Sequence, residues 1–285
     1  MKRMEYGKKW LLAACGTLAL LVLLAYLVSR IADGPWTATP LTEEEADGLT
    51  KSGLALAAEK RYDSALKIWI RLEHGLRSAP DPVRRALAAQ ASYNKGVTLQ
   101  EMDEPRKAIR VYLKVEKEYA ADPDQRIRIQ TVRSAVNRGI ALLGMEKHVE
   151  AISVFRAVVK TNARDDSPEV RSLLARARLN LGTALGQSGK HEAAVEEFAG
   201  VDQEYGADAV PTTREMVAHA LYNRGIALSM LDRTREAIDI LDSVRKRYGD
   251  AGEFRTYTWV VRAKEARTAL SVGQVAAPAA GTGDR

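Results

Sequence analysis

Several residue groups in this 285-residue chain have spacings that could support catalysis, but each lacks a required partner. His191 and Glu192 begin like a zinc-protease helix, yet the position four after His191 is Val195, so the second zinc-binding histidine is missing. Gly189 and Lys190 lack the earlier glycine and the following Ser or Thr of a phosphate-binding loop. The Ser-x-x-Lys spacing occurs twice, at Ser64 to Lys67 and at Ser92 to Lys95, but the other catalytic motifs that accompany it in enzymes are missing. The sequence therefore predicts no enzyme, no metal site and no cofactor.

The distribution of charge argues against nucleic-acid binding. The formal net charge is +6, and residues 1–32, with five Lys or Arg and one Glu, account for +4 of it. A nucleic-acid-binding protein needs basic charge on its folded body, where phosphates dock. Here the remaining chain is nearly balanced, so we expect no nucleic-acid partner.

The N-terminus has the pattern of a membrane segment. An uncharged run of nineteen residues extends from Trp10 to Val28, and as a helix it would span roughly 28 Å, close to the bilayer's hydrocarbon thickness. Four Lys or Arg precede it within nine residues. The positive-inside rule then predicts a cytoplasmic leader at residues 1–9, a transmembrane signal anchor at 10–31 and an extracytoplasmic remainder that begins with a linker at 32–41.

Two alternatives to a retained anchor stay open. A cleaved signal peptide needs a shorter apolar stretch and a small-residue site, and Arg30 stands at the wrong place for such a site. Leu12 to Cys15 resembles the lipobox of bacterial lipoproteins, but most of the apolar run follows Cys15 and would remain after cleavage. As the only cysteine, Cys15 cannot form an intramolecular disulfide.

The chain beyond this segment contains a repeat with a period of 43 residues. The repeated glycines are Gly53, Gly96, Gly139, Gly182 and Gly225. Twelve positions after each glycine stands Ala65, Ala108, Ala151, Ala194 or Ala237. Four positions after each alanine stands Trp69, Tyr112, Phe155, Phe198 or Leu241. Five copies of the same columns predict five similar units.

Each unit is expected to fold as two antiparallel helices. The small glycine and alanine allow the two helices to approach closely while the large apolar residue fills the adjacent hole. Helix starts are indicated by a Thr42 and Glu45 capping box and by Asp81, Asp122 and Ser167, each of which precedes a proline.

These columns resemble the tetratricopeptide repeat family, with five repeats over residues 42–252. The family period is 34 residues, so each unit here has about nine extra residues, which we place mainly in the first helix. Residues 253–272 are predicted to form a terminal capping helix and residues 273–285 a disordered tail. The expected fold is an all-α solenoid of helix-turn-helix repeats plus one N-terminal transmembrane helix, as in single-pass membrane-anchored bacterial members of the family.

The resemblance implies that the first helices line a groove in which a peptide or partner protein binds. Two positions before the glycine are Asn94, Asn137, Asn180 and Asn223, whose amides could hydrogen-bond a peptide backbone, as a matching asparagine column does in some family members. One turn earlier are Gln90, Arg133, Arg176 and His219, which could bind carboxylates. One position after the glycine, Val97, Ile140, Thr183 and Ile226 add an apolar component. Alternatively, the asparagines have no ligand and the arginines are simply solvated.

We therefore predict a membrane-anchored protein-interaction scaffold at the bacterial cytoplasmic membrane, with its repeats on the extracytoplasmic side. Its layout is similar to that of membrane-anchored tetratricopeptide proteins that assist secretion or envelope assembly. Two alternatives remain: a self-associating structural protein that forms homo-oligomers, and a regulatory subunit that tethers an enzyme.

Overall fold

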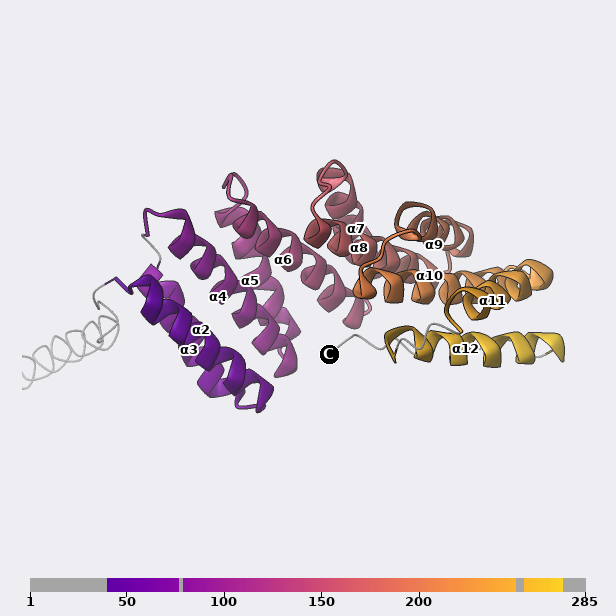
Figure 1. The fold of residues 1–285 in the computed structure, drawn as a ribbon, viewed down its shortest axis with the longest axis horizontal. Helices are drawn as coiled ribbons and strands as arrows, with labels where there is room; N and C mark the ends of the chain where they lie inside the picture. Colours follow the sequence, from indigo (N-terminus) through magenta and orange to yellow (C-terminus); the bar gives the residue numbers. More distant parts are fainter. Residues whose placement is uncertain (1–39, 77–78, 250–253, 274–285) are drawn as a thin grey trace, which may run out of the picture.

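The computed structural model describes residues 40–76, 79–249 and 254–273, which form eleven helices and contain no strand (Figure 1). The predicted leader, the signal anchor, the linker up to residue 39 and the tail from residue 274 lie outside the described residues. Among the described helices, none has both the length and the apolar character needed to cross a bilayer.

The first ten described helices alternate between longer and shorter ones, which form five pairs. The first helices of the pairs are α2 (Glu43–Ala58), α4 (Pro82–Glu101), α6 (Gln125–Gly144), α8 (Pro168–Gln187) and α10 (Pro211–Ser229). The second helices are α3 (Tyr62–Leu76), α5 (Pro105–Glu118), α7 (His148–Asn162), α9 (His191–Tyr205) and α11 (Thr234–Tyr248). The chain continues in α12 (Phe254–Ser271). An all-helical array of helix pairs is thus confirmed for the described residues.

The helix starts agree with the predicted caps at two places. The Thr42 capping box is present, and the Asp81 side chain accepts a hydrogen bond from the Arg84 amide at 2.9 Å. At α6 the prediction is wrong, because the N-cap is Asp124 and not Asp122. Ser167 is the N-cap of α8, but its side chain makes no capping bond there.

Each pair is closed by a tight turn in which one residue has a left-handed backbone conformation. The values of φ are 59° for Lys60, 58° for Asp103, 59° for Glu146, 78° for Gly189 and 57° for Asp232. The next residue in each turn donates its amide to the carbonyl of the repeated leucine, as Lys147 does to Leu142 at 2.9 Å. This pattern satisfies a free carbonyl at the end of the first helix.

The repeated glycines lie where the two helices of a pair cross. A Cβ atom placed on Gly139 would lie 2.5 Å from Phe155, and one on Gly53 would lie 2.5 Å from Trp69. Both aromatic rings are fully buried. The glycine is therefore needed because the partner's ring occupies the space of a side chain.

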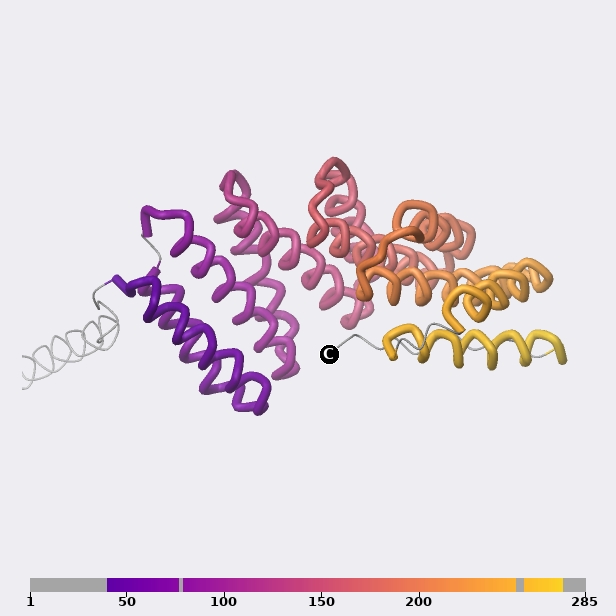
Figure 2. Tube along the Cα trace, in the orientation of Figure 1, coloured from indigo at the N-terminus to yellow at the C-terminus, as the bar shows by residue number. Residues whose placement is uncertain are grey.

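The pairs stack in a row so that the helices form two layers (Figure 2). Among the described residues, each first helix packs closely against the neighbouring first helices, whereas the second helices lie further apart. They reach one another through long side chains, as in the ion pair of Lys114 on α5 with Glu73 on α3 at 3.1 Å. The layer whose helices lie closer together is the shorter one, so the first helices form the inner side of the array.

Candidate partner-binding surface

One stripe of α4, α6, α8 and α10 stays partly open after the helices have packed. Each helix presents its other faces to the second helix of its own pair and to that of the preceding pair. The open stripe, here called the inner stripe, contains Gln90, Asn94, Val97, Arg133, Asn137, Ile140, Arg176, Asn180, Thr183, His219, Asn223 and Ile226. All of these are half-buried except Ile226, which is buried. Neighbouring first helices flank the stripe, which explains the partial burial.

Arg133 and Arg176 are the two positive charges that α6 and α8 place on the inner stripe. Neither guanidinium forms an ion pair with a carboxylate of the described residues. Close by in the chain, Arg138 binds both carboxylate oxygens of Glu116, at 2.7 and 2.8 Å. A half-buried guanidinium without a carboxylate retains donors that a planar anion could accept.

The asparagines of the inner stripe differ in how their amides are used. Asn137 donates to the hydroxyl of Tyr93 at 3.1 Å, and Asn180 donates to the carbonyl of Arg176 at 2.9 Å. The amide nitrogen of Asn94 is buried and has no partner among the described residues. The amide nitrogen of Asn94 is therefore an unsatisfied donor, whereas those of Asn137 and Asn180 each donate one hydrogen bond to the protein.

Sequence analysis missed the tyrosines beside Asn137. Tyr93 on α4 and Tyr112 on α5 have ring centroids 6.2 Å apart, and the Tyr112 hydroxyl donates to Gln100 Oε1 at 3.3 Å. Burial raises the pKa of Tyr112 well above its usual range, so its hydroxyl stays protonated. The available signal was the position of Tyr93, which directly precedes Asn94 in a column that contains Val136 and Leu179 in the next two repeats.

His219 differs from the other members of its column. Its ring stacks on Trp259 of α12, with centroids 3.5 Å apart and planes 11° apart. Burial, with a smaller contribution from the positive charge of Arg262, lowers the pKa of His219 to about 3. The His219 ring is therefore neutral at pH 7, unlike Arg133 and Arg176 in the same column.

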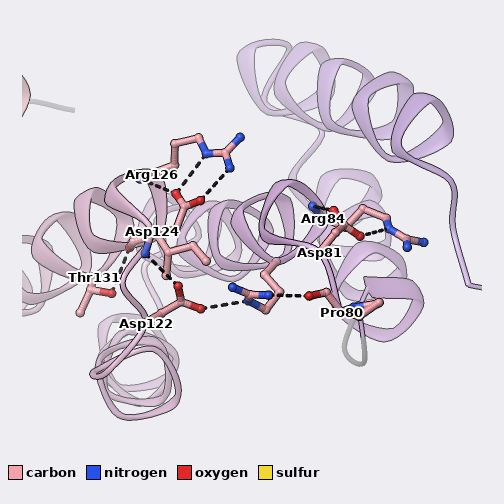
Figure 3. Close-up of polar contacts among 9 residues, drawn as sticks. Pro80, Asp81, Arg84, Asp122, Asp124, Arg126 and Thr131 are labelled. Atoms are coloured by element: carbon pink, nitrogen blue, oxygen red, sulfur yellow. Dashed lines mark hydrogen bonds and ion pairs between the residues drawn. The ribbon is translucent and has the colours of Figure 1, made fainter.

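A different set of arginines, near the starts of the first helices, forms ion pairs that recur along the array. The fourth residue of α4, α6 and α8 is an arginine that pairs with an aspartate 37 positions later, in the loop before the next first helix. The pairs are Arg85 with Asp122 at 3.0 Å, Arg128 with Asp165, and Arg171 with Asp208 at 3.3 Å. Asp122 and Pro80, both labelled in Figure 3, accept hydrogen bonds from Arg85. These ion pairs connect neighbouring repeats.

Three of the residues with apparent catalytic spacing, Ser92, Lys95 and Gly189, have structural roles. Ser92 donates to Glu73 Oε1 at 2.9 Å and Lys95 binds Glu73 Oε2 at 2.6 Å, so both side chains are directed to a carboxylate on α3. Gly189 is the left-handed residue of a turn. Within the described ranges no three His, Cys, Asp or Glu side chains are grouped as metal ligands.

Comparison with known proteins supports tetratricopeptide repeats in this chain. The family model described as tetratricopeptide repeat matches residues 219–251, which include most of α10 and all of α11. No curated protein matches the sequence. An engineered protein of known crystal structure has 16% sequence identity, with 81% of this chain and 91% of that chain covered and a TM-score of 0.48. The Rap conjugation gene regulator of the plasmid pLS20, solved in complex with the Phr* peptide, has 16% identity, coverage of 80% and 75%, and a TM-score of 0.44.

Proposed function

We propose that this chain is a scaffold that binds an extended, carboxylate-bearing segment of a partner protein along the inner stripe. The observation that carries the proposal is the pair of half-buried arginines, Arg133 and Arg176, which have no carboxylate partner among the described residues. The unpaired amide of Asn94 adds a donor for a peptide carbonyl. The tetratricopeptide match supports the same class of function.

The test places a photo-crosslinking amino acid at Thr183 of the inner stripe in cells that make the full chain. A matched control places it at Val149, which is 75% exposed on α7 in the outer layer. We expect Thr183 to give a discrete crosslinked protein that Val149 does not give. The double substitution Arg133→Gln and Arg176→Gln should abolish this crosslink, and equal crosslinking with and without it would contradict the proposal.

We further propose that the array is held at the extracytoplasmic face of a bacterial cytoplasmic membrane. This rests on the uncharged run from Trp10 to Val28 and the basic residues before it. There the scaffold would serve a client in secretion or envelope assembly. Added protease should digest the array in intact spheroplasts, and protection of the array would reverse this topology.

A further inference from the structure

Helix α12 occupies the place of a sixth first helix. It packs on α11 and α10, just as α10 packs on α9 and α8 (Figure 1). A shift of 43 residues takes the buried Thr213 and Ala220 of α10 to the buried Thr256 and Ala263 of α12. The packing register of the first helices thus continues after the repeated glycine and alanine columns have ended.

The other face of α12 shows where the array stops. On α10, Leu221, Gly225 and Leu228 are buried, and Gly225 packs against Leu241 of α11. They correspond to Lys264, Thr268 and Ser271 in α12, and all three of these are exposed. This list shows that α12 is polar where a further second helix would dock. Helix α12 therefore caps the array with its polar face. Its buried face keeps the register of the first helices.

In that register Arg262 of α12 corresponds to His219 of α10, since it stands 43 positions later. Its guanidinium lies 5.1 Å from the centroid of the Trp259 ring, and its Nη1 atom is buried without a hydrogen-bond partner among the described residues. It forms no ion pair with a described carboxylate. Arg262 thus shares with Arg133 and Arg176 both their column and their lack of an anionic partner.

We infer that α12 forms the last step of the partner-binding surface and that Arg262 binds a carboxylate of the partner there. The inference rests on the proposed function. The column then has positive charges on α6, α8 and α12, with the neutral His219 between the last two. The tight stack of His219 on Trp259 fixes α12 against α10, so that Arg262 is held in position.

The spacing of these charges specifies the partner's sequence. Neighbouring packed helices are about 10 Å apart, and an extended chain rises about 3.3 Å per residue. An acidic residue opposite Arg133 should therefore be followed by one about three residues away, opposite Arg176, and by another about six residues further, opposite Arg262. A segment with its acidic groups adjacent would not match this array.

The experiment measures binding of a fluorescein-labelled decapeptide to the full chain by fluorescence anisotropy. The peptide has glutamate at positions 1, 4 and 10 and serine elsewhere, and a second peptide has the reversed order. Arg262→Gln should weaken the better of the two about tenfold. The matched control Arg267→Gln, which removes an exposed α12 arginine lying near Asp242, should change binding less than twofold. Arg262→Lys should recover part of the loss.

A second measurement does not depend on how the variants fold. A photo-crosslinker placed next to the glutamate that is six residues from its nearest glutamate should label residues 254–271 of the wild-type chain. Loss of affinity in Arg262→Gln no larger than in Arg267→Gln, or labelling confined to other helices, overturns the inference. If the inference fails but the double variant Arg133→Gln, Arg176→Gln still binds the peptide more weakly, the proposed function stands without α12. If neither peptide binds the wild-type chain, both proposals fail.

Discussion

At the residue scale, one buried hydroxyl is out of place. Ser134 of α6 is fully buried, and its oxygen has no hydrogen-bond partner among the described residues. The corresponding residues of α4, α8 and α10 are Ala91, Ala177 and Ala220. A buried unpaired polar group costs about 1 to 3 kcal/mol, so Ser134→Ala should raise the free energy of unfolding by about 1 kcal/mol.

Chemical denaturation of the full chain measures this change. The control is Ser172→Ala, because the Ser172 hydroxyl is hydrogen-bonded to Thr213 at 2.9 Å across α8 and α10. That substitution should lower the free energy of unfolding by about 1 kcal/mol. A loss of stability in both variants would show that the Ser134 hydroxyl is satisfied.

His219 makes the stability of the array depend on pH. In the folded chain its pKa is lowered to about 3, mainly by burial, whereas the ordinary value is 6.5. Between these values the unfolded chain binds more protons, so this contribution is complete above pH 6.5 and is lost as the pH falls toward 3. A fall from pH 7.5 to pH 5 should therefore cost about 2 kcal/mol.

The variant His219→Phe isolates this effect. It keeps an aromatic ring against Trp259 but cannot be protonated, so its loss of stability between pH 7.5 and pH 5 should be smaller by about 2 kcal/mol. His74→Gln, a substitution at an exposed histidine of α3, should leave the wild-type difference unchanged. An unaltered pH dependence in His219→Phe would mean that His219 accepts a proton while folded.

At the scale of the elements, two glycines of α6 separate crossing geometry from helix propensity. A Cβ on Gly139 would lie 2.5 Å from Phe155, whereas one on Gly144 would have no neighbour within 4 Å. Gly139→Ala should destabilise the chain by about 1 to 3 kcal/mol through overpacking. Gly144→Ala should stabilise it by up to about 1 kcal/mol. Thermal unfolding followed by circular dichroism compares them, and equal effects would exclude the crossing argument.

The helix pairs were predictable because packing repeats the same residue types. Gly139 with Phe155, and its counterparts, produce a signal at a fixed spacing that chance cannot imitate. The start of α6 was not predictable, because Asp122 and Asp124 are both good caps and only the structure shows that Asp122 pairs with Arg85 instead.

The candidate site was predictable only in part. The asparagine and arginine columns follow from the register, but the register does not reveal which side chains already have partners. The stack of His219 on Trp259 joins two helices through one residue pair that no other repeat contains. Such single contacts between different side chains leave no periodic pattern in a sequence.

At the scale of the whole molecule, the hydrophobic core is not uniform along the array. Buried apolar residues form one large cluster that involves α6 to α12 and two small ones, one in α2 to α4 and one in α4 and α5. Where α5 meets α6, Glu116 and Arg138 form a half-buried ion pair. The corresponding residues where α7 meets α8 are Val159 and Leu181, which belong to the large cluster or pack on it.

This difference predicts that the array opens first at its N-terminal end. Repeat arrays open in units set by the contacts between neighbours. Hydrogen exchange on the full chain should therefore show α2 to α5 opening with a free energy a few kcal/mol below that of α6 to α12.

The double substitution Glu116→Val with Arg138→Leu reproduces the apolar contact of α7 with α8. It should narrow this gap between the two opening free energies, because apolar residues that replace a buried ion pair are often stabilising. Arg138→Leu alone leaves Glu116 without its partner, so it should widen the gap. A single opening free energy for all helices would show that the polar contact couples the two parts as strongly as the apolar one.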